Sequence, residues 1–137
     1  MSTVQVGTVL PTRAVAGVDP ARMKTMAALL RDPNPIHYDL SAVKAAGMGD
    51  RVVNQGPSNV GYIVNLLLEW TGDPAAIRSV RSRFVGNVFA GDHVTAGGEV
   101  TAVEPVDGAQ QVTCAVWLDR DDGVRLVAGE ALLVIPA

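Results

Sequence analysis

Asp32 and His37 are the one titratable pair in this sequence that lies on a backbone stiff enough to aim both side chains at a single point. They are five positions apart, too far to be neighbours on a helix, and Pro33 and Pro35 lie between them. Each proline fixes its own φ and disfavours helical geometry at the residue before it, so this segment is predicted to be an ordered loop. A carboxylate beside an imidazole can hold a water molecule and move protons near neutral pH. The same pattern also suits an ordinary turn after a helix, so a purely structural role stays open.

Two helices are predicted to flank this loop. The first has Asp19 as its N-cap and Pro20 at its first position, and it stops by Arg31 because Pro33 disfavours helical geometry at Asp32. After the loop, Ser41 is expected to cap a short helix over residues 41–46.

A third, longer helix is predicted over residues 57–70. Its apolar side chains cover more than one face, which predicts that it is buried nearly all round. Its polar side chains form a single stripe with the spacing i, i+4, i+7, i+11, made of Ser58, Tyr62, Asn65 and Glu69. The stripe is either a seam facing solvent or another subunit, or the wall of a pocket. In the second case Asn65 is a candidate pocket residue.

From residue 76 onward the apolar residues recur with a period of two, which is typical of strands. Four strands are predicted over residues 77–84, 92–103, 111–118 and 125–135, with breaks at 86–87, 105–108 and 121–123. An earlier strand over residues 6–16, interrupted by Pro11, is expected at a sheet edge. This order predicts an α+β architecture in which an antiparallel sheet wraps around the long helix.

The composition bounds the class of protein. The 137 residues are expected to form one domain, residues 1–137, and 48% of them are apolar, which is ample for a core. No stretch approaches the roughly 18 apolar residues of a membrane span, and the start of the chain has no signal-peptide pattern, so a cytoplasmic protein is expected. The net charge of −3 argues against a nucleic-acid-binding protein. We expect no metal site, and the lone Cys114 is expected in the core.

With this order of elements, the chain resembles the MaoC-like, R-specific enoyl-CoA hydratases, which have a hotdog fold. The signature loop of that family is close to Gly-Asp-x-Asn-Pro-Leu-His, and it reads Arg31-Asp32-Pro33-Asn34-Pro35-Ile36-His37 here. Weaker matches are Gln55-Gly56-Pro57 for His-Gly-Met, residues 84–94 for a Phe-x-x-Pro-Val-x-x-Gly-Asp-x-Val strand segment, and Gly129-Glu130-Ala131 near the end. The long helix, with Asn-Val-Gly-Tyr at residues 59–62 and Glu-Trp-Thr-Gly-Asp-Pro at residues 69–74, is similar to steroid side-chain hydratase subunits of actinobacteria.

The resemblance implies roles for particular residues. Asp32 and His37 would activate water for addition to a trans-2-enoyl thioester, and the backbone N–H of Gly56 would stabilise the thioester oxygen. Asn34 would brace the loop, and it is counted with Gln55, Asn65, Arg81 and Arg83 as a candidate for substrate binding. Arg81 and Arg83 are candidates because coenzyme A is anionic.

The resemblance also implies the partners. The substrate would be an acyl-CoA or acyl-carrier thioester, with no cofactor besides the coenzyme A of the substrate, and the chain would pair as a homodimer or with a related hotdog chain. Gln55, Pro57 and the Arg31 that replaces a small residue depart from the family pattern. Two alternatives therefore stay open: a supporting subunit of a heteromeric hydratase, and a repurposed hotdog that catalyses cyclisation or conjugate addition.

Overall fold

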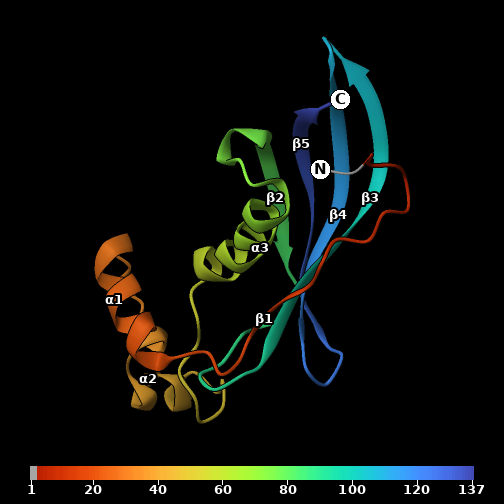
Figure 1. Cartoon of the computed structure of the whole chain (residues 1–137). Coiled ribbons are helices and arrows are strands. Elements are labelled where there is room, and N and C mark those ends of the chain that lie inside the picture. The colour runs from red at the N-terminus through yellow and green to blue at the C-terminus, as the bar shows by residue number, and fades with distance from the viewer. Residues whose placement is uncertain (1–2) are drawn as a thin grey trace.

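The computed structural model describes residues 3–137 as a twisted antiparallel sheet with one long helix against it (Figure 1). The sheet has five strands in the order β1-β3-β4-β5-β2. In chain order the elements are β1 (Arg13–Val15), α1 (Pro20–Leu30), η1 (Pro35–His37), α2 (Leu40–Ala45), α3 (Gly56–Thr71), η2 (Pro74–Ala76), β2 (Ile77–Phe84), β3 (Val94–Val106), β4 (Ala109–Arg120) and β5 (Arg125–Pro136). The α+β arrangement is the predicted one, and α1 and α2 lie beyond the sheet at one end of the molecule (Figure 1).

The edge strand β1 is much shorter than the predicted strand over residues 6–16. Only Arg13–Val15 pairs with β3, and Val9 adds an isolated bridge to Glu99. Gly7 has a φ of 89°, and Pro11 has no N–H to donate to a ladder, so the segment before β1 follows the sheet only intermittently. The expected position at the edge is confirmed.

The hairpin between β3 and β4 is tighter than predicted. The expected break over residues 105–108 is reduced to the pair Asp107-Gly108, whose φ angles of 44° and 78° are both positive. Two residues with positive φ suit the two-residue turns that match the strand twist. Strand β3 therefore runs through Pro105, which lies opposite Gln110.

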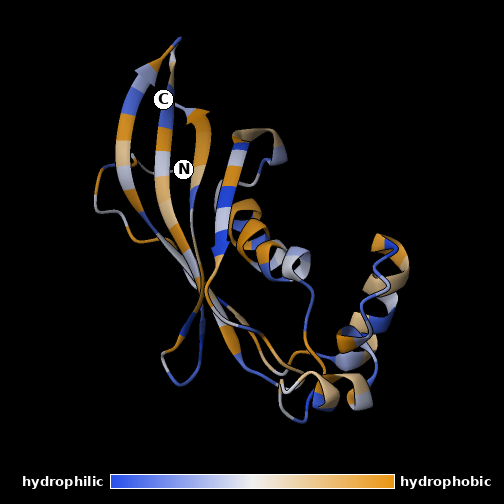
Figure 2. Ribbon diagram, turned by 180° about the vertical axis from the view of Figure 1, so that it is seen from behind, coloured by the Kyte–Doolittle hydropathy of each residue, from blue (hydrophilic) through white to orange (hydrophobic). Residues whose placement is uncertain are grey.

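Helix α3 begins at Gly56 rather than Pro57 and ends at Thr71, and Gly72, with a φ of 68°, is its C-cap. Its face toward the sheet is buried, and it is formed by Ile63, Leu66 and Leu67. The prediction of burial nearly all round is wrong for a single chain, because the apolar residues Val64 and Leu68 are only partly buried. Along the strands, apolar and polar residues alternate as bands of colour in Figure 2. The apolar bands of β4 are the buried side chains of Val112, Cys114, Val116 and Leu118.

The caps of the first two helices differ in how well they were predicted. Asp19 accepts a hydrogen bond from the Ala21 N–H, as expected of the N-cap of α1. Helix α2 is capped by Asp39, which accepts from the Ser41 N–H, so the predicted cap at Ser41 is wrong by two residues. Both residues are of capping types, and Asp39 is the one with extended backbone geometry.

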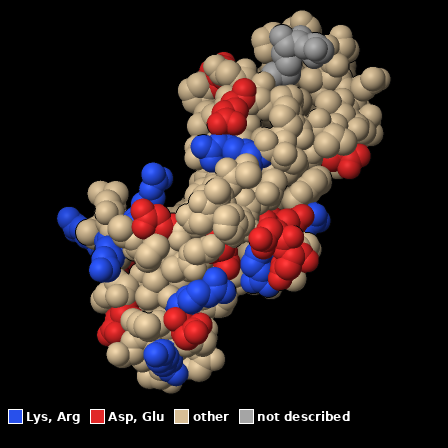
Figure 3. Space-filling view, turned by 60° about the horizontal axis from the view of Figure 1, so that its bottom comes forward, with Lys and Arg blue, Asp and Glu red and all other residues tan. Residues whose placement is uncertain are grey.

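Charges of both signs are interspersed on the face of the molecule seen in Figure 3. Among residues 3–137, no helix is both long and apolar enough to cross a membrane. The same residues contain no group of three or more side chains placed to hold a metal ion.

Candidate active site

The loop between α1 and α2 brings Asp32 and His37 into contact. Nε2 of His37 lies 3.2 Å from Oδ2 of Asp32. The imidazole is buried, with 7% of its residue surface exposed, whereas the Asp32 side chain is about one-third exposed, at 34%. The pair therefore has one partner held in the protein and one that reaches toward solvent.

The other ring nitrogen of His37 is held by the segment that leads into α3. Nδ1 lies 2.7 Å from the backbone oxygen of Val53, in a buried contact. A carbonyl oxygen only accepts hydrogen bonds, so Nδ1 carries a hydrogen. In the neutral imidazole Nε2 then has no hydrogen. Because the Asp32 carboxylate is also an acceptor, a proton has to lie between the two atoms or a water molecule has to donate to both.

The backbone of the loop is fixed at several points. Arg31 ends α1 in the left-handed conformation, with a φ of 51°, and the Asp32 N–H then returns to the Ala27 oxygen at 3.0 Å. Oδ1 of Asp32 accepts from the Asn34 N–H at 3.0 Å, and Oδ1 of Asn34 accepts from the Ile36 N–H at 3.3 Å. These bonds explain how a non-helical segment can hold Oδ2 of Asp32 against the imidazole. Asn34 lies where it can brace the loop.

Gly56 is the first residue of α3, and its N–H is one of the amides that a helix leaves without an intrahelical acceptor. The Phe84 ring, at the end of β2, packs on Gly56 so closely that an added Cβ would lie 3.0 Å from Cζ. The positive end of the helix dipole also falls here. This amide is suited to stabilise a developing negative charge.

Gln55 is 1% exposed and lies inside the protein rather than on a surface. Its Nε2 donates to the backbone oxygen of Met23 at 2.8 Å and so ties α3 to α1. Its Oε1 is buried without a hydrogen-bond partner among the described residues. The Gln55 side-chain amide therefore acts as a tether between α1 and α3, and its Oε1 remains an unpaired acceptor among the described residues.

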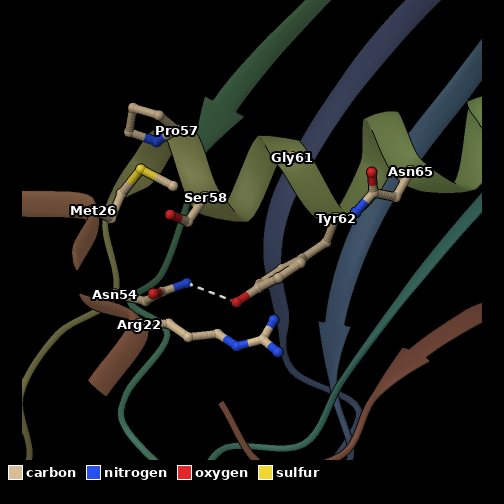
Figure 4. A pocket seen from close by; sticks show the side chains of 8 residues that line it. All are labelled: Arg22, Met26, Asn54, Pro57, Ser58, Gly61, Tyr62 and Asn65. Atoms are coloured by element: carbon tan, nitrogen blue, oxygen red, sulfur yellow. Dashed lines mark hydrogen bonds between the residues drawn. The ribbon is translucent and has the colours of Figure 1, made fainter. Parts of the chain in front are cut away.

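A cavity of about 240 Å³ lies between α1 and α3 (Figure 4). Three residues of the predicted polar stripe, Ser58, Tyr62 and Asn65, line it, so this part of the stripe is a pocket wall. The fourth, Glu69, is instead paired with Arg13 at 2.8 Å.

Sequence reasoning missed two residues at this cavity. Arg22 of α1 lines it, and so does Asn54, which donates to the Tyr62 hydroxyl at 3.2 Å. The sequence carries a weak signal for Asn54, because the polar pair Asn54-Gln55 directly precedes α3. Arg22 has none, because its place opposite α3 depends on the tertiary fold.

Arg81 and Arg83 do not converge on the Asp32–His37 pair in this chain. Both are exposed on the edge strand β2. Side chains alternate along a strand, so the two arginines point to the face opposite that of Phe84, whose ring touches Gly56. Their role in binding coenzyme A remains a prediction.

Comparison with known proteins gives consistent matches. Residues 2–120 match the family described as MaoC like domain. A relative from Mycobacterium tuberculosis, the 3-oxo-4,17-pregnadiene-20-carboxyl-CoA hydratase beta subunit, is 36% identical over 98 residues, which are 72% of this chain and 74% of the relative.

Solved structures agree with the sequence matches. A chain of the ChsH1-ChsH2 complex from Mycobacterium tuberculosis superposes with a TM-score of 0.81 and 30% identity, covering 98% of this chain and 99% of the other. The (R)-hydratase from A. caviae involved in PHA biosynthesis gives a TM-score of 0.85 at 25% identity, covering 99% of this chain and all of the other, at 100%. These likenesses confirm the predicted hotdog fold.

Proposed function

The chain belongs to the MaoC like domain family, and on this basis we propose that it hydrates trans-2-enoyl thioesters with R stereochemistry, or dehydrates the corresponding 3-hydroxyacyl thioesters. The observation that carries the proposal is the contact of 3.2 Å between Nε2 of His37 and Oδ2 of Asp32. It supplies a proton acceptor and a carboxylate at one point, beside the amino end of α3.

Hydration adds the oxygen of water to C3 of the enoyl group and a proton to C2. In the proposed mechanism, a water molecule contacts both Nε2 of His37 and the Asp32 carboxylate. The pair takes one proton from this water as its oxygen bonds to C3, and it returns one proton to C2, so the enzyme ends the cycle unchanged.

The thioester oxygen gains negative charge as C3 is attacked. We propose that the Gly56 N–H donates to this oxygen at the dipole-positive end of α3. Two features support this role: Gly56 has no side chain to obstruct the ligand, and Val53, three residues earlier, already holds His37. No metal or redox group takes part in the proposed step.

The proposed assembly is a pair of hotdog chains, either two copies of this one or this chain with a related one. Large apolar side chains are exposed around the loop, with Leu29 at 73% and Tyr38 at 45% exposure. Phe84 and Val85, which follow each other at the end of the edge strand β2, are exposed by 52% and 51%. Apolar surface of this kind commonly marks an interface.

A second candidate function is favoured by the name of one relative, which describes the beta subunit of a hydratase. In that case this chain supports a partner that carries the chemistry. The two functions differ in one respect: a supporting subunit would not need Asp32 or His37 for the activity of the assembled enzyme.

The direct test is to incubate the purified chain with crotonyl-CoA and with a bulky steroid enoyl-CoA, alone and with a co-expressed partner chain, and to follow the loss of enoyl absorbance. The chirality of the 3-hydroxyacyl product is then read with a stereospecific dehydrogenase. We expect turnover of at least one substrate to the R product. The absence of turnover under all four conditions would contradict the hydratase function.

A further inference from the structure

Among the hydrogen-bond donors that line the cavity between α1 and α3, two have particular importance, and the proposed water addition uses neither of them. They are the Tyr62 hydroxyl and the Arg22 guanidinium, and Figure 4 shows the guanidinium running beside the Tyr62 ring. Asn54 and Ser58 lie at the end of the cavity nearest the start of α3, and Asn65 lies farther along the helix.

Asn54 donates to the oxygen of the Tyr62 hydroxyl, which leaves the hydroxyl hydrogen to be donated elsewhere. Nδ2 of Asn54 donates to the hydroxyl oxygen at 3.2 Å, and to Oδ1 of the buried Asn59 at 2.8 Å, so the amide orientation is fixed. The hydroxyl hydrogen has no acceptor among residues 3–137, so it is available to donate to a ligand.

The Arg22 guanidinium has donors only, and no carboxylate of the described residues lies within salt-bridge distance of it. This differs from Arg13 and Arg51, which pair with Glu69 at 2.8 Å and with Asp92 at 2.7 Å. Arg22 is an exposed residue, so a hydrocarbon in the cavity would strip water from the Tyr62 hydroxyl and from only the part of the guanidinium that faces the cavity. Neither loss would be replaced by a hydrogen bond, which is unfavourable.

We propose that this cavity binds the distal part of the acyl group and selects chains that carry an acceptor oxygen there, a carboxylate above all. The inference rests on the proposed function and adds the class of substrate. A guanidinium prefers a carboxylate because the charge assists each hydrogen bond. The cavity volume of about 240 Å³ lies just below the roughly 300–1,000 Å³ of sites for drug-sized ligands. The cavity of a single protein chain is therefore large enough for a short acyl group.

The test uses enoyl-CoA substrates of two chain lengths that differ only at the far end of the acyl group. The end is a carboxylate, a methyl ketone or an isopropyl group, which have similar shapes. In the wild-type assembly we expect kcat/KM to fall in that order, with about a tenfold or greater difference between carboxylate and isopropyl. High salt should reduce the preference for the carboxylate over the other two end groups, and it should leave the ratio of kcat/KM between the ketone and the isopropyl compound unchanged.

Two variants separate the donors. Arg22→Met should bring the carboxylate substrate down to the level of the ketone, and Tyr62→Phe should bring the ketone toward the isopropyl compound. Lys24→Met is the matched control, since Lys24 is an exposed cation on the same helix that does not line the cavity. It should keep the wild-type order.

The outcomes distinguish this inference from the proposed function. Equal kcat/KM for the three end groups, or an equal effect of Lys24→Met and Arg22→Met, would overturn the inference and leave the hydratase function standing. If none of the enoyl compounds is hydrated, the proposed function fails. Calorimetric binding of the saturated analogues then still tests the cavity, and equal affinity for carboxylate and isopropyl ends overturns it.

Discussion

His37 donates from Nδ1 to the backbone oxygen of Val53 at 2.7 Å, and this bond decides which ring nitrogen is free for chemistry. The free nitrogen, Nε2, is the one that faces Asp32 at 3.2 Å. Because Val53 lies in the segment that enters α3, the same contact joins the loop to the start of that helix. The geometry of the site therefore depends on a backbone carbonyl as much as on the two titratable side chains.

Replacing Gly56 with alanine should impair activity more than stability. An added Cβ would lie 3.0 Å from the Phe84 ring, but that ring is half exposed and can move by a few tenths of an ångström. We expect the free energy of unfolding to change by less than about 1 kcal/mol, since alanine also favours the helix. We expect kcat/KM to fall by about tenfold or more, because the methyl group and the displaced ring crowd the amide that would contact the thioester. Steady-state kinetics and urea denaturation measure the two effects.

Gly61→Ala, in the middle of the same helix, is a control for stability only, because Gly61 lines the cavity between α1 and α3. Nothing lies within 4 Å of a Cβ added at Gly61, so this variant should be more stable than wild type by about 0.5–1 kcal/mol. If Gly56→Ala kept full activity, or destabilised the protein by several kcal/mol, the tight approach at the start of α3 would not have the role assigned to it.

The Gln55 amide should tolerate an apolar replacement better than a charged one. Gln55→Met loses the bond to the Met23 oxygen but also removes the unpaired Oε1, so a cost of about 1 kcal/mol or less is expected. Gln55→Glu places a carboxylate oxygen against that carbonyl in a buried site, and the cost should be about 2–3 kcal/mol. The cost should be larger at pH 8 than at pH 5, where the carboxyl group can be protonated. Denaturation curves at both pH values test this, and equal costs for the two variants would argue against the tether.

The buried Cys114 predicts a loss of stability in alkali. Burial raises the pKa of its thiol from 9.0 to about 11. Above pH 9 the unfolded chain loses this proton before the folded protein does, so the free energy of unfolding falls as the pH rises toward 11 and is unaffected below 9. The contribution should reach up to about 2–3 kcal/mol. Cys114→Ala should lack it, and stability curves of the two proteins that stay parallel from pH 8 to pH 10.5 would contradict the prediction.

Local chemistry made much of the fold predictable. The Asp19-Pro20 pair placed the start of α1 because the cap and the proline act within one turn. The stiff loop between Pro33 and Pro35 predicted a shared target for Asp32 and His37, and the structure brings their side chains into contact. The turn after Arg120 was also predictable, because Gly123 adopts a positive φ of 87° there.

Features that depend on distant residues were not predictable in the same way. Whether Ser41 or Asp39 caps α2 depends on how the chain leaves the preceding loop, and both residue types satisfy the pattern. The length of β1 depends on how many residues of the segment before α1 pair with β3, which is distant in the sequence. The cavity forms because Arg22 of α1 lies opposite Tyr62 of α3. The residue pattern within either helix does not predict this arrangement.

The most direct test of the central claim is the hydration rate of Asp32→Asn and His37→Gln variants, measured as kcat/KM on the best enoyl thioester in the same assembly as the wild type. Both substitutions nearly preserve shape, so thermal unfolding should show folded proteins. The proposed acid–base pair predicts that each variant loses about 10²–10⁴-fold in rate. Variants that are folded and as active as the wild type would contradict it, and would assign the chemistry to a partner chain.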